Sequence, residues 1–141
     1  MSGARRIICV GNRFHPRDDA GPRVYDLLAR GRLPDGVDVI DGGLAGVDLV
    51  RFVEGAERVV FVDNLAGPGD PGRVVRLDRV QLACGSAPAY GHAEGLAYLL
   101  HALPLLCAGD PPEIALVGIA GAADDGAVRE MAEASLAWVG R

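Results

Sequence analysis

The chain has 141 residues, half of them apolar, and a formal net charge of −5. Its length fits one domain over residues 1–141, and the apolar fraction excludes a disordered chain. The acidic balance argues against a nucleic acid partner, because phosphate binding needs a clustered basic surface. No stretch reaches the roughly 18 apolar residues of a membrane span, and the three cysteines lack metal-binding or disulfide spacing. We therefore expect a cytoplasmic protein that does not act in a membrane.

The first half of the chain alternates predicted strands and helices. Residues 6–10 form a continuous apolar run typical of a buried strand, and helical periodicity then extends from near Pro22 to Gly31. Further along, the patterns predict a strand over 37–40, a helix over 45–55 and a strand over 58–63.

The second half begins with an alternating segment, 73–77, which predicts an edge strand. It follows the preceding strand after about ten residues, too few for a helical crossover, so we expect it to be antiparallel. The remaining patterns predict a helix from His92 to Pro104, a strand over 114–119 and a helix over 125–139.

Strand–helix alternation with right-handed crossovers predicts an α/β fold, with a mostly parallel sheet between helices. If the chain reverses its winding direction after the second strand, the first and third strands become neighbours. The crevice beyond their carboxyl ends is then the topological switch point, where such sheets bind ligands.

Three chemically active side chains are expected at this edge of the sheet. Asp18 follows the first strand, Asp63 ends the third strand, and His92 begins a helix. Two carboxylates and an imidazole suit a transition metal, with coordination positions left open for a substrate. A helix N-terminus also favours the neutral imidazole that a metal needs.

Each of these residues also has a structural interpretation. Asp18 or Asp19 would cap the following helix, Asp63 and Asn64 would be turn residues, and a lone histidine is more often structural. The Asp41-Gly42-Gly43 segment is first a turn that needs positive φ, although its glycines would also admit an extended substrate backbone. His15 and Arg17 flank the acid pair and are expected to be solvated.

Several motifs in order resemble the hydrogenase maturation endopeptidases. These are Gly11-Asn12 with Asp18 and Ala20-Gly21-Pro22, then Asp41-Gly42-Gly43, Val60-Phe61-Val62-Asp63, Gly91-His92 with Gly95-Leu96, and Leu116-Val117-Gly118-Ile119. The resemblance implies a three-layer α/β/α sandwich around a five-stranded sheet with one antiparallel strand. It also implies an endopeptidase that removes a C-terminal extension from the large-subunit precursor of nickel–iron hydrogenase after nickel insertion.

By this resemblance, Asp18, Asp63 and His92 contact the nickel that the substrate carries, and Gly42 and Gly43 border the substrate. Asp18 and Asp63 are the candidate catalytic residues. Either the nickel polarises the scissile carbonyl or activates a water molecule with help from a carboxylate, or the carboxylates activate the water themselves.

Two departures from the family pattern keep alternatives open. Arg17 and Asp19 stand where the family often has Asp and Gly, so a one-residue slip would give Asp19 the ligand role. Residues 119–126 are shorter than the corresponding family loop, which bears on substrate specificity. The competing functions are a non-catalytic, metal-dependent binding or escort module and an RNA-directed hydrolase resembling peptidyl-tRNA hydrolase. The latter lacks its Thr-Arg-His-Asn signature here.

Overall fold

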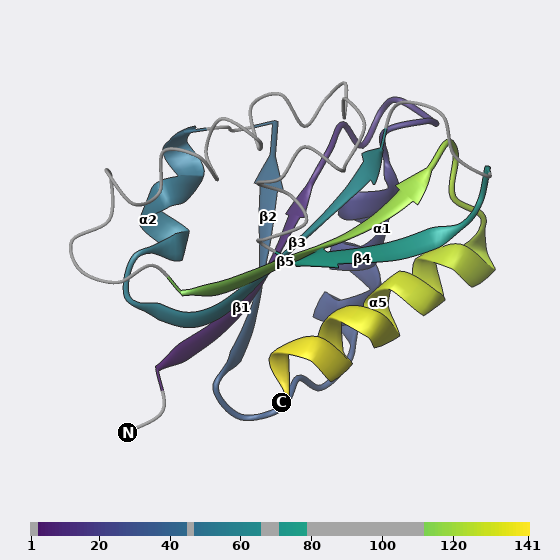
Figure 1. The fold of residues 1–141 in the computed structure, drawn as a ribbon. Coiled ribbons are helices and arrows are strands. Elements are labelled where there is room, and N and C mark those ends of the chain that lie inside the picture. Colours follow the sequence, from purple (N-terminus) through teal and green to yellow (C-terminus); the bar gives the residue numbers. More distant parts are fainter. Residues whose placement is uncertain (1–2, 45–46, 66–70, 79–111) are drawn as a thin grey trace.

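The computed structural model describes residues 3–44, 47–65, 71–78 and 112–141. Five strands in this part of the chain form one sheet, in the spatial order β2-β1-β3-β5-β4 (Figure 1). The strands are β1 (Ala4–Val10), β2 (Val37–Gly43), β3 (Ala56–Leu65), β4 (Val74–Asp78) and β5 (Glu113–Ala120). Four run parallel and β4 is antiparallel to β5. The expected α/β class, with one antiparallel edge strand, is confirmed.

Helices cover both faces of this sheet, which gives the three expected layers (Figure 1). Helices α1 (Ala20–Arg30) and α5 (Asp125–Val139) lie on one face, and the short α2 (Val50–Val53) lies on the other. The bounds of α5 are those predicted from its periodicity. Asp124 caps this helix, because its Oδ1 accepts a hydrogen bond from the Ala127 amide at 2.7 Å.

Alternation along the central strands divides the core in two. Ile7 and Cys9 of β1 pack with the layer of α1 and α5, whereas Ile8 packs with Leu49 and Val53 on the opposite face. Cys9 is fully buried, and this burial, together with the nearby Asp41 and Asp26, raises the pKa of its thiol. Strands that are buried on both faces explain the continuous apolar runs in the sequence.

The predicted helix over 45–55 is much shorter in the structure. A turn of 3₁₀ helix, η1 (Val47–Leu49), leads into α2, which ends at Val53. Glu54 is already extended and Gly55 adopts a φ of +77°. The chain leaves the helix here because the following residues enter β3 at Ala56.

Some predictions fall on residues that the structure does not describe. The helix predicted from His92 to Pro104 lies outside the described residues. Within the described ranges, no helix is long and apolar enough to cross a membrane.

Candidate active site

The loop between β1 and α1 folds back onto the end of β1. The Asn12 amide donates to the Asp18 carbonyl at 2.8 Å and to Asp18 Oδ2 at 3.2 Å. Gly11, with a φ of +146°, permits this closure, since a Cβ there would lie 2.3 Å from the Asp18 carbonyl oxygen. The loop therefore fixes Asp18 at the carboxyl end of the strand.

Asp18 and Asp63 are both withdrawn from solvent at this edge. Asp18 is 1% exposed and Asp63 is fully buried near the end of β3, which pairs directly with β1. Burial and the nearby charge of Asp18 raise the pKa of Asp63 to about 8, against the opposing effect of a hydrogen bond from the Asn64 amide. The two carboxyl groups therefore interact electrostatically across the β1–β3 boundary, as the predicted strand order requires.

The hydrogen bonding of Asp63 is incomplete within the described part of the chain. Oδ1 accepts a hydrogen bond from the Asn64 amide at 2.8 Å, while the buried Oδ2 has no hydrogen-bond donor there. Burial of an unsatisfied carboxylate oxygen is unfavourable unless a proton or a cation compensates it. Two adjacent buried carboxyl groups thus fit a divalent cation better than a neutral ligand.

The third predicted ligand cannot be placed, because His92 lies outside the described residues. Among the residues that are described, no group of three or more His, Cys, Asp and Glu side chains is arranged to hold a metal ion. The described part of the site is therefore the carboxyl pair of Asp18 and Asp63.

Asp19 was expected to cap α1, and this expectation is wrong for its side chain. Asp19 occupies the N-cap position, but its carboxylate makes no capping hydrogen bond and pairs instead with Arg23 at 3.7 Å. N-cap side chains bond the second or third amide of a helix, and the third residue of α1 is Pro22, which has no N–H. The first amide of the helix, that of Ala20, donates to Asn64 Oδ1 at 2.9 Å.

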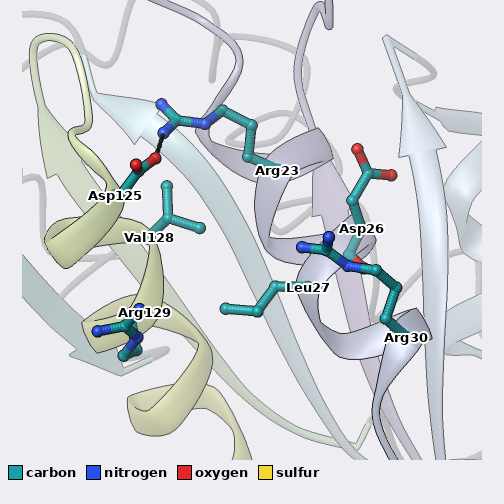
Figure 2. Close-up of a pocket in the computed structure, with 7 residues that line it drawn as sticks. All are labelled: Arg23, Asp26, Leu27, Arg30, Asp125, Val128 and Arg129. Carbon is teal, nitrogen blue, oxygen red and sulfur yellow. Dashed lines mark hydrogen bonds and ion pairs between the residues drawn. The ribbon is translucent and has the colours of Figure 1, made fainter.

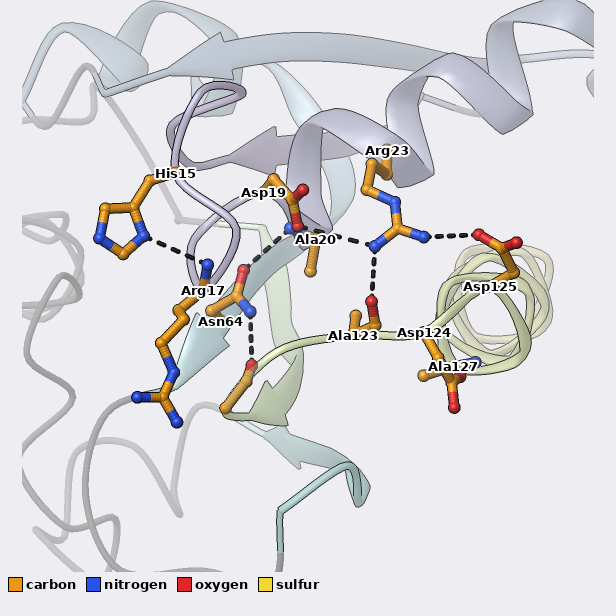
Figure 3. A network of polar contacts seen from close by, with 11 residues as sticks. His15, Arg17, Asp19, Ala20, Arg23, Asn64, Ala123, Asp124, Asp125 and Ala127 are labelled. Atoms are coloured by element: carbon orange, nitrogen blue, oxygen red, sulfur yellow. Dashed lines mark hydrogen bonds and ion pairs between the residues drawn. The ribbon is translucent and has the colours of Figure 1, made fainter.

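Asn64 and Arg23 join α1 to the connection between β5 and α5 (Figure 3). Asn64 Nδ2 donates to the Gly121 carbonyl at 2.7 Å, and Arg23 bonds the Ala123 carbonyl and the Asp125 carboxylate at 2.5 and 2.6 Å. Sequence reasoning treated Asn64 as a turn residue and did not single out Arg23. The sequence feature that could have identified Asn64 is its position next to Asp63, just after the apolar run of β3.

The two glycines proposed to border a substrate differ in the structure. The segment predicted as a turn is the last part of β2, and only its final residue, Gly43, has a positive φ, +56°. A Cβ at Gly43 would meet no atom of the described residues within 4 Å. Gly42 is buried, and a Cβ there would lie 3.1 Å from Leu49 Cδ2 and 3.2 Å from the Cys9 carbonyl oxygen. Gly42 therefore serves packing, whereas Gly43 is free of such contacts in the described part of the chain, and its carbonyl accepts a hydrogen bond from the Gly11 amide at 2.9 Å.

The loop that bears Asp18 also carries exposed side chains. His15 and Arg17 are solvent-exposed, as expected, and the Arg17 amide donates to His15 Nδ1 at 3.2 Å (Figure 3). Phe14 in the same loop is 90% exposed, and Leu44, which follows β2, is 68% exposed. These are the two large hydrophobic side chains that the described part of the chain leaves exposed, and their loops are joined by the Gly11–Gly43 hydrogen bond.

A separate cavity of about 320 Å³ lies between α1 and α5 (Figure 2). Leu27 and Val128 line it together with charged side chains, of which Arg23 and Asp125 form an ion pair. Neither Asp18 nor Asp63 contributes to its walls. The carboxyl pair and this cavity are therefore distinct features of the molecule.

The fold and the site define an α/β protein with buried acids at the switch point of its sheet. Residues 22–132 match the model of the HycI family, described as hydrogenase maturation protease. The chain belongs to this hydrogenase maturation protease family. It is 30% identical over 117 residues to the hydrogenase 2 maturation protease of Escherichia coli (strain K12), an alignment that covers 80% of this chain and 70% of that protein.

Further comparisons agree with this family. The chain is 34% identical over 136 residues to the hydrogenase expression/formation protein HupM of Azotobacter chroococcum mcd 1, covering 92% of this chain and 65% of that protein. The hydrogenase maturating endopeptidase HybD from Escherichia coli shares the fold with a TM-score of 0.75 and 26% identity, over 96% of this chain and 89% of that one. The chain spans 56–65% of the length of HupM and two further hydrogenase expression/formation proteins.

Proposed function

We propose that this chain is an endopeptidase that removes the C-terminal extension of a nickel–iron hydrogenase large-subunit precursor after nickel has been inserted. Family membership supports the peptidase class, and HybD, which shares the fold, is a hydrogenase maturating endopeptidase. The observation that carries the proposal is the pair of buried carboxyl groups, Asp18 and Asp63, at adjacent strand ends. We predict that the chain processes this precursor in the cytoplasm.

Asp18, Asp63 and His92 are the residues proposed to contact the nickel, which arrives as part of the substrate. Carboxylate and imidazole ligands suit a divalent transition metal, and Oδ2 of Asp63, which has no hydrogen-bond partner among the described residues, provides an acceptor for it. A cation beside two buried carboxyl groups offsets their mutual repulsion. The site would therefore favour a nickel-loaded precursor over a nickel-free one.

The raised pKa of Asp63 suggests how protons are handled. With a pKa of about 8, Asp63 carries a proton at neutral pH in the free protein. A docked divalent cation favours the carboxylate, so Asp63 would release this proton on substrate binding and become available as a base. Nickel in the substrate would polarise the scissile carbonyl or the attacking water; in the alternative route, Asp18 or Asp63 activates the water directly.

The direct test is to incubate the chain with a purified nickel-loaded precursor and to follow the mass of the precursor. We expect the mass to fall by that of the C-terminal peptide, with no change for the nickel-free precursor. Asp63→Asn should abolish processing, whereas Asp38→Asn, at an exposed carboxylate near the start of β2, should leave it intact. An unchanged precursor mass with the wild-type chain, for every hydrogenase precursor of the source organism, would refute the proposal.

A second candidate is a non-catalytic module that binds or escorts the metal-loaded precursor through the same residues. The buried carboxyl pair is compatible with it, since contact with the metal needs Asp18 and Asp63 but no cleavage step. Formation of a nickel-dependent complex without any loss of precursor mass would select this function over proteolysis.

A further inference from the structure

The side chain of Asn64 connects β3 by hydrogen bonds to the start of α1 and to the segment after β5. It lies in β3 directly after Asp63, is 3% exposed, and both ends of its side-chain amide are bonded to backbone atoms of other segments. Oδ1 accepts from the Ala20 amide at 2.9 Å, and Nδ2 donates to the Gly121 carbonyl at 2.7 Å (Figure 3).

The first of these bonds acts on Asp18. Ala20 is the first residue of α1 and lies two residues after Asp18, whose own position depends on the short loop from Gly11. Because Asp19 does not cap the helix, the bond from Asn64 is the side-chain interaction that secures the first amide of α1. It ties the segment that bears Asp18 to the strand that bears Asp63.

The second bond and the main chain act on Asp63. The Asn64 amide donates to Asp63 Oδ1, which orients the neighbouring carboxyl group. The bond to Gly121 anchors the Asn64 side chain against the end of β5, so its orientation is fixed from both sides. A buried side chain with all of its hydrogen bonds directed to backbone atoms has little freedom to move.

We propose that Asn64 is a positioning residue that sets the separation of the Asp18 and Asp63 carboxyl groups. The proposal rests on the proposed function where catalysis is concerned, but the positioning itself is a property of the free protein. A two-carboxylate site must match a metal or a reacting carbonyl closely, and an error of about 1 Å can cost on the order of a hundredfold in rate.

The main variant is Asn64→Leu, which preserves size and removes both hydrogen bonds. We expect the Ala20 amide to exchange with solvent about tenfold faster, as measured by NMR, and the Asp18–Asp63 distance in a crystal structure to change by about 1 Å. On the nickel-loaded precursor, kcat should fall about a hundredfold, with KM within about twofold, because the docking surface is unaltered.

Two control variants separate positioning from general stability. Ser135→Ala removes another fully buried hydrogen bond, from Ser135 Oγ to the Met131 carbonyl within α5, and should leave the distance and kcat unchanged. Arg23→Met removes the hydrogen bonds from Arg23 to the Ala123 carbonyl and the Asp125 carboxylate, and it should also leave the Asp18–Asp63 distance and kcat unchanged. If Asn64→Leu does not fold, Asn64→Ser, whose hydroxyl cannot reach both partners, is measured in its place.

An unchanged Asp18–Asp63 distance together with a wild-type kcat overturns the proposal and reduces Asn64 to a cap of α1. An equal loss of kcat in Arg23→Met overturns it as well. If the wild-type chain processes no precursor, the proposed function fails, and the crystallographic distance alone decides whether Asn64 positions the pair.

Discussion

The guanidinium of Arg58 lies over the indole ring of Trp138, with 4.0 Å between Cζ and the ring centroid. Arg58 belongs to β3 and Trp138 to the last turn of α5, so this contact fastens the end of the C-terminal helix to the centre of the sheet. The same guanidinium donates to the Trp138 carbonyl at 3.0 Å and pairs with Glu113 of β5.

We predict that Arg58→Met destabilises the protein by about 1–3 kcal/mol, because it removes a partly buried cation–π contact and a hydrogen bond together. The measurement is the free energy of unfolding in urea. Arg51→Met is the matched control: Arg51 stacks on Phe52 at 4.7 Å but is exposed, so we expect a loss below about 0.5 kcal/mol. Equal losses in the two variants would contradict the role given to Arg58.

Asp63 should make the stability of the free protein depend on pH. Its pKa is raised from 3.8 to about 8 by burial and by Asp18, so the folded state retains a proton that the unfolded state releases. The contribution of Asp63 to the free energy of unfolding should therefore be largest below about pH 4, decrease as the pH rises towards 8, and stay constant above it. The total change is on the order of a few kcal/mol.

Asp63→Asn should flatten this pH profile and leave the variant more stable than the wild-type chain at pH 8. Urea unfolding at a series of pH values gives both curves. Asp41→Asn, at an exposed carboxylate, provides the comparison and should keep the wild-type slope. A slope that survives in Asp63→Asn would show that another group binds the proton.

Phe14 and Leu44 are expected to contact the precursor protein if the proposed function holds. Both are highly exposed, on two loops that the Gly11–Gly43 hydrogen bond joins beside the buried carboxyl groups. Covering one such side chain with substrate contributes about 1.5–3 kcal/mol. Phe14→Ser and Leu44→Ser should each raise the KM for the precursor about tenfold or more and leave kcat nearly constant.

The control for this prediction is Arg32→Ser, in the exposed connection between α1 and β2. Arg32→Ser should change neither kcat nor the KM for the precursor. A fall in kcat without a rise in KM for Phe14→Ser would assign the loop a role in chemistry instead of docking.

Gly21 should tolerate no side chain. A Cβ at this position would lie 2.1 Å from the Val10 carbonyl oxygen and 2.7 Å from the Val10 amide nitrogen, both of them backbone atoms that cannot move aside. Gly21→Ala should therefore cost about 2–3 kcal/mol of folding free energy by pushing α1 away from β1. Thermal and urea unfolding measure the loss.

Gly126→Ala is the counterpart in the first turn of α5, where the nearest atom to a new Cβ is 3.4 Å away. There we expect little change, or a gain of about 0.5 kcal/mol from the better helix propensity of alanine. A comparable loss at both glycines would indicate that helix position, not contact with β1, determines the cost.

Local patterns in the sequence determined most of the fold. Four sequence patterns correspond to elements of the structure: the apolar runs that end at Val10 and Asp63, the alternation in 73–77 and the periodicity of 125–139. They could be recognised because the periods of strands and helices appear in consecutive residues. The adjacency of β1 and β3 was expected only if the chain reversed its winding direction after the second strand, and the observed strand order shows this reversal.

Only the tertiary structure decided how these elements terminate and what holds the acid pair. The Ala20 amide is bonded by Asn64, which is 44 residues away, and the carboxylate of Asp19, although adjacent, turns to Arg23. Gly42 and Gly43 cannot be distinguished from the sequence, yet Gly42 packs against Leu49, whereas Gly43 has no such contact with the described residues. Such choices depend on partners that meet only when the sheet assembles, so no local pattern encodes them.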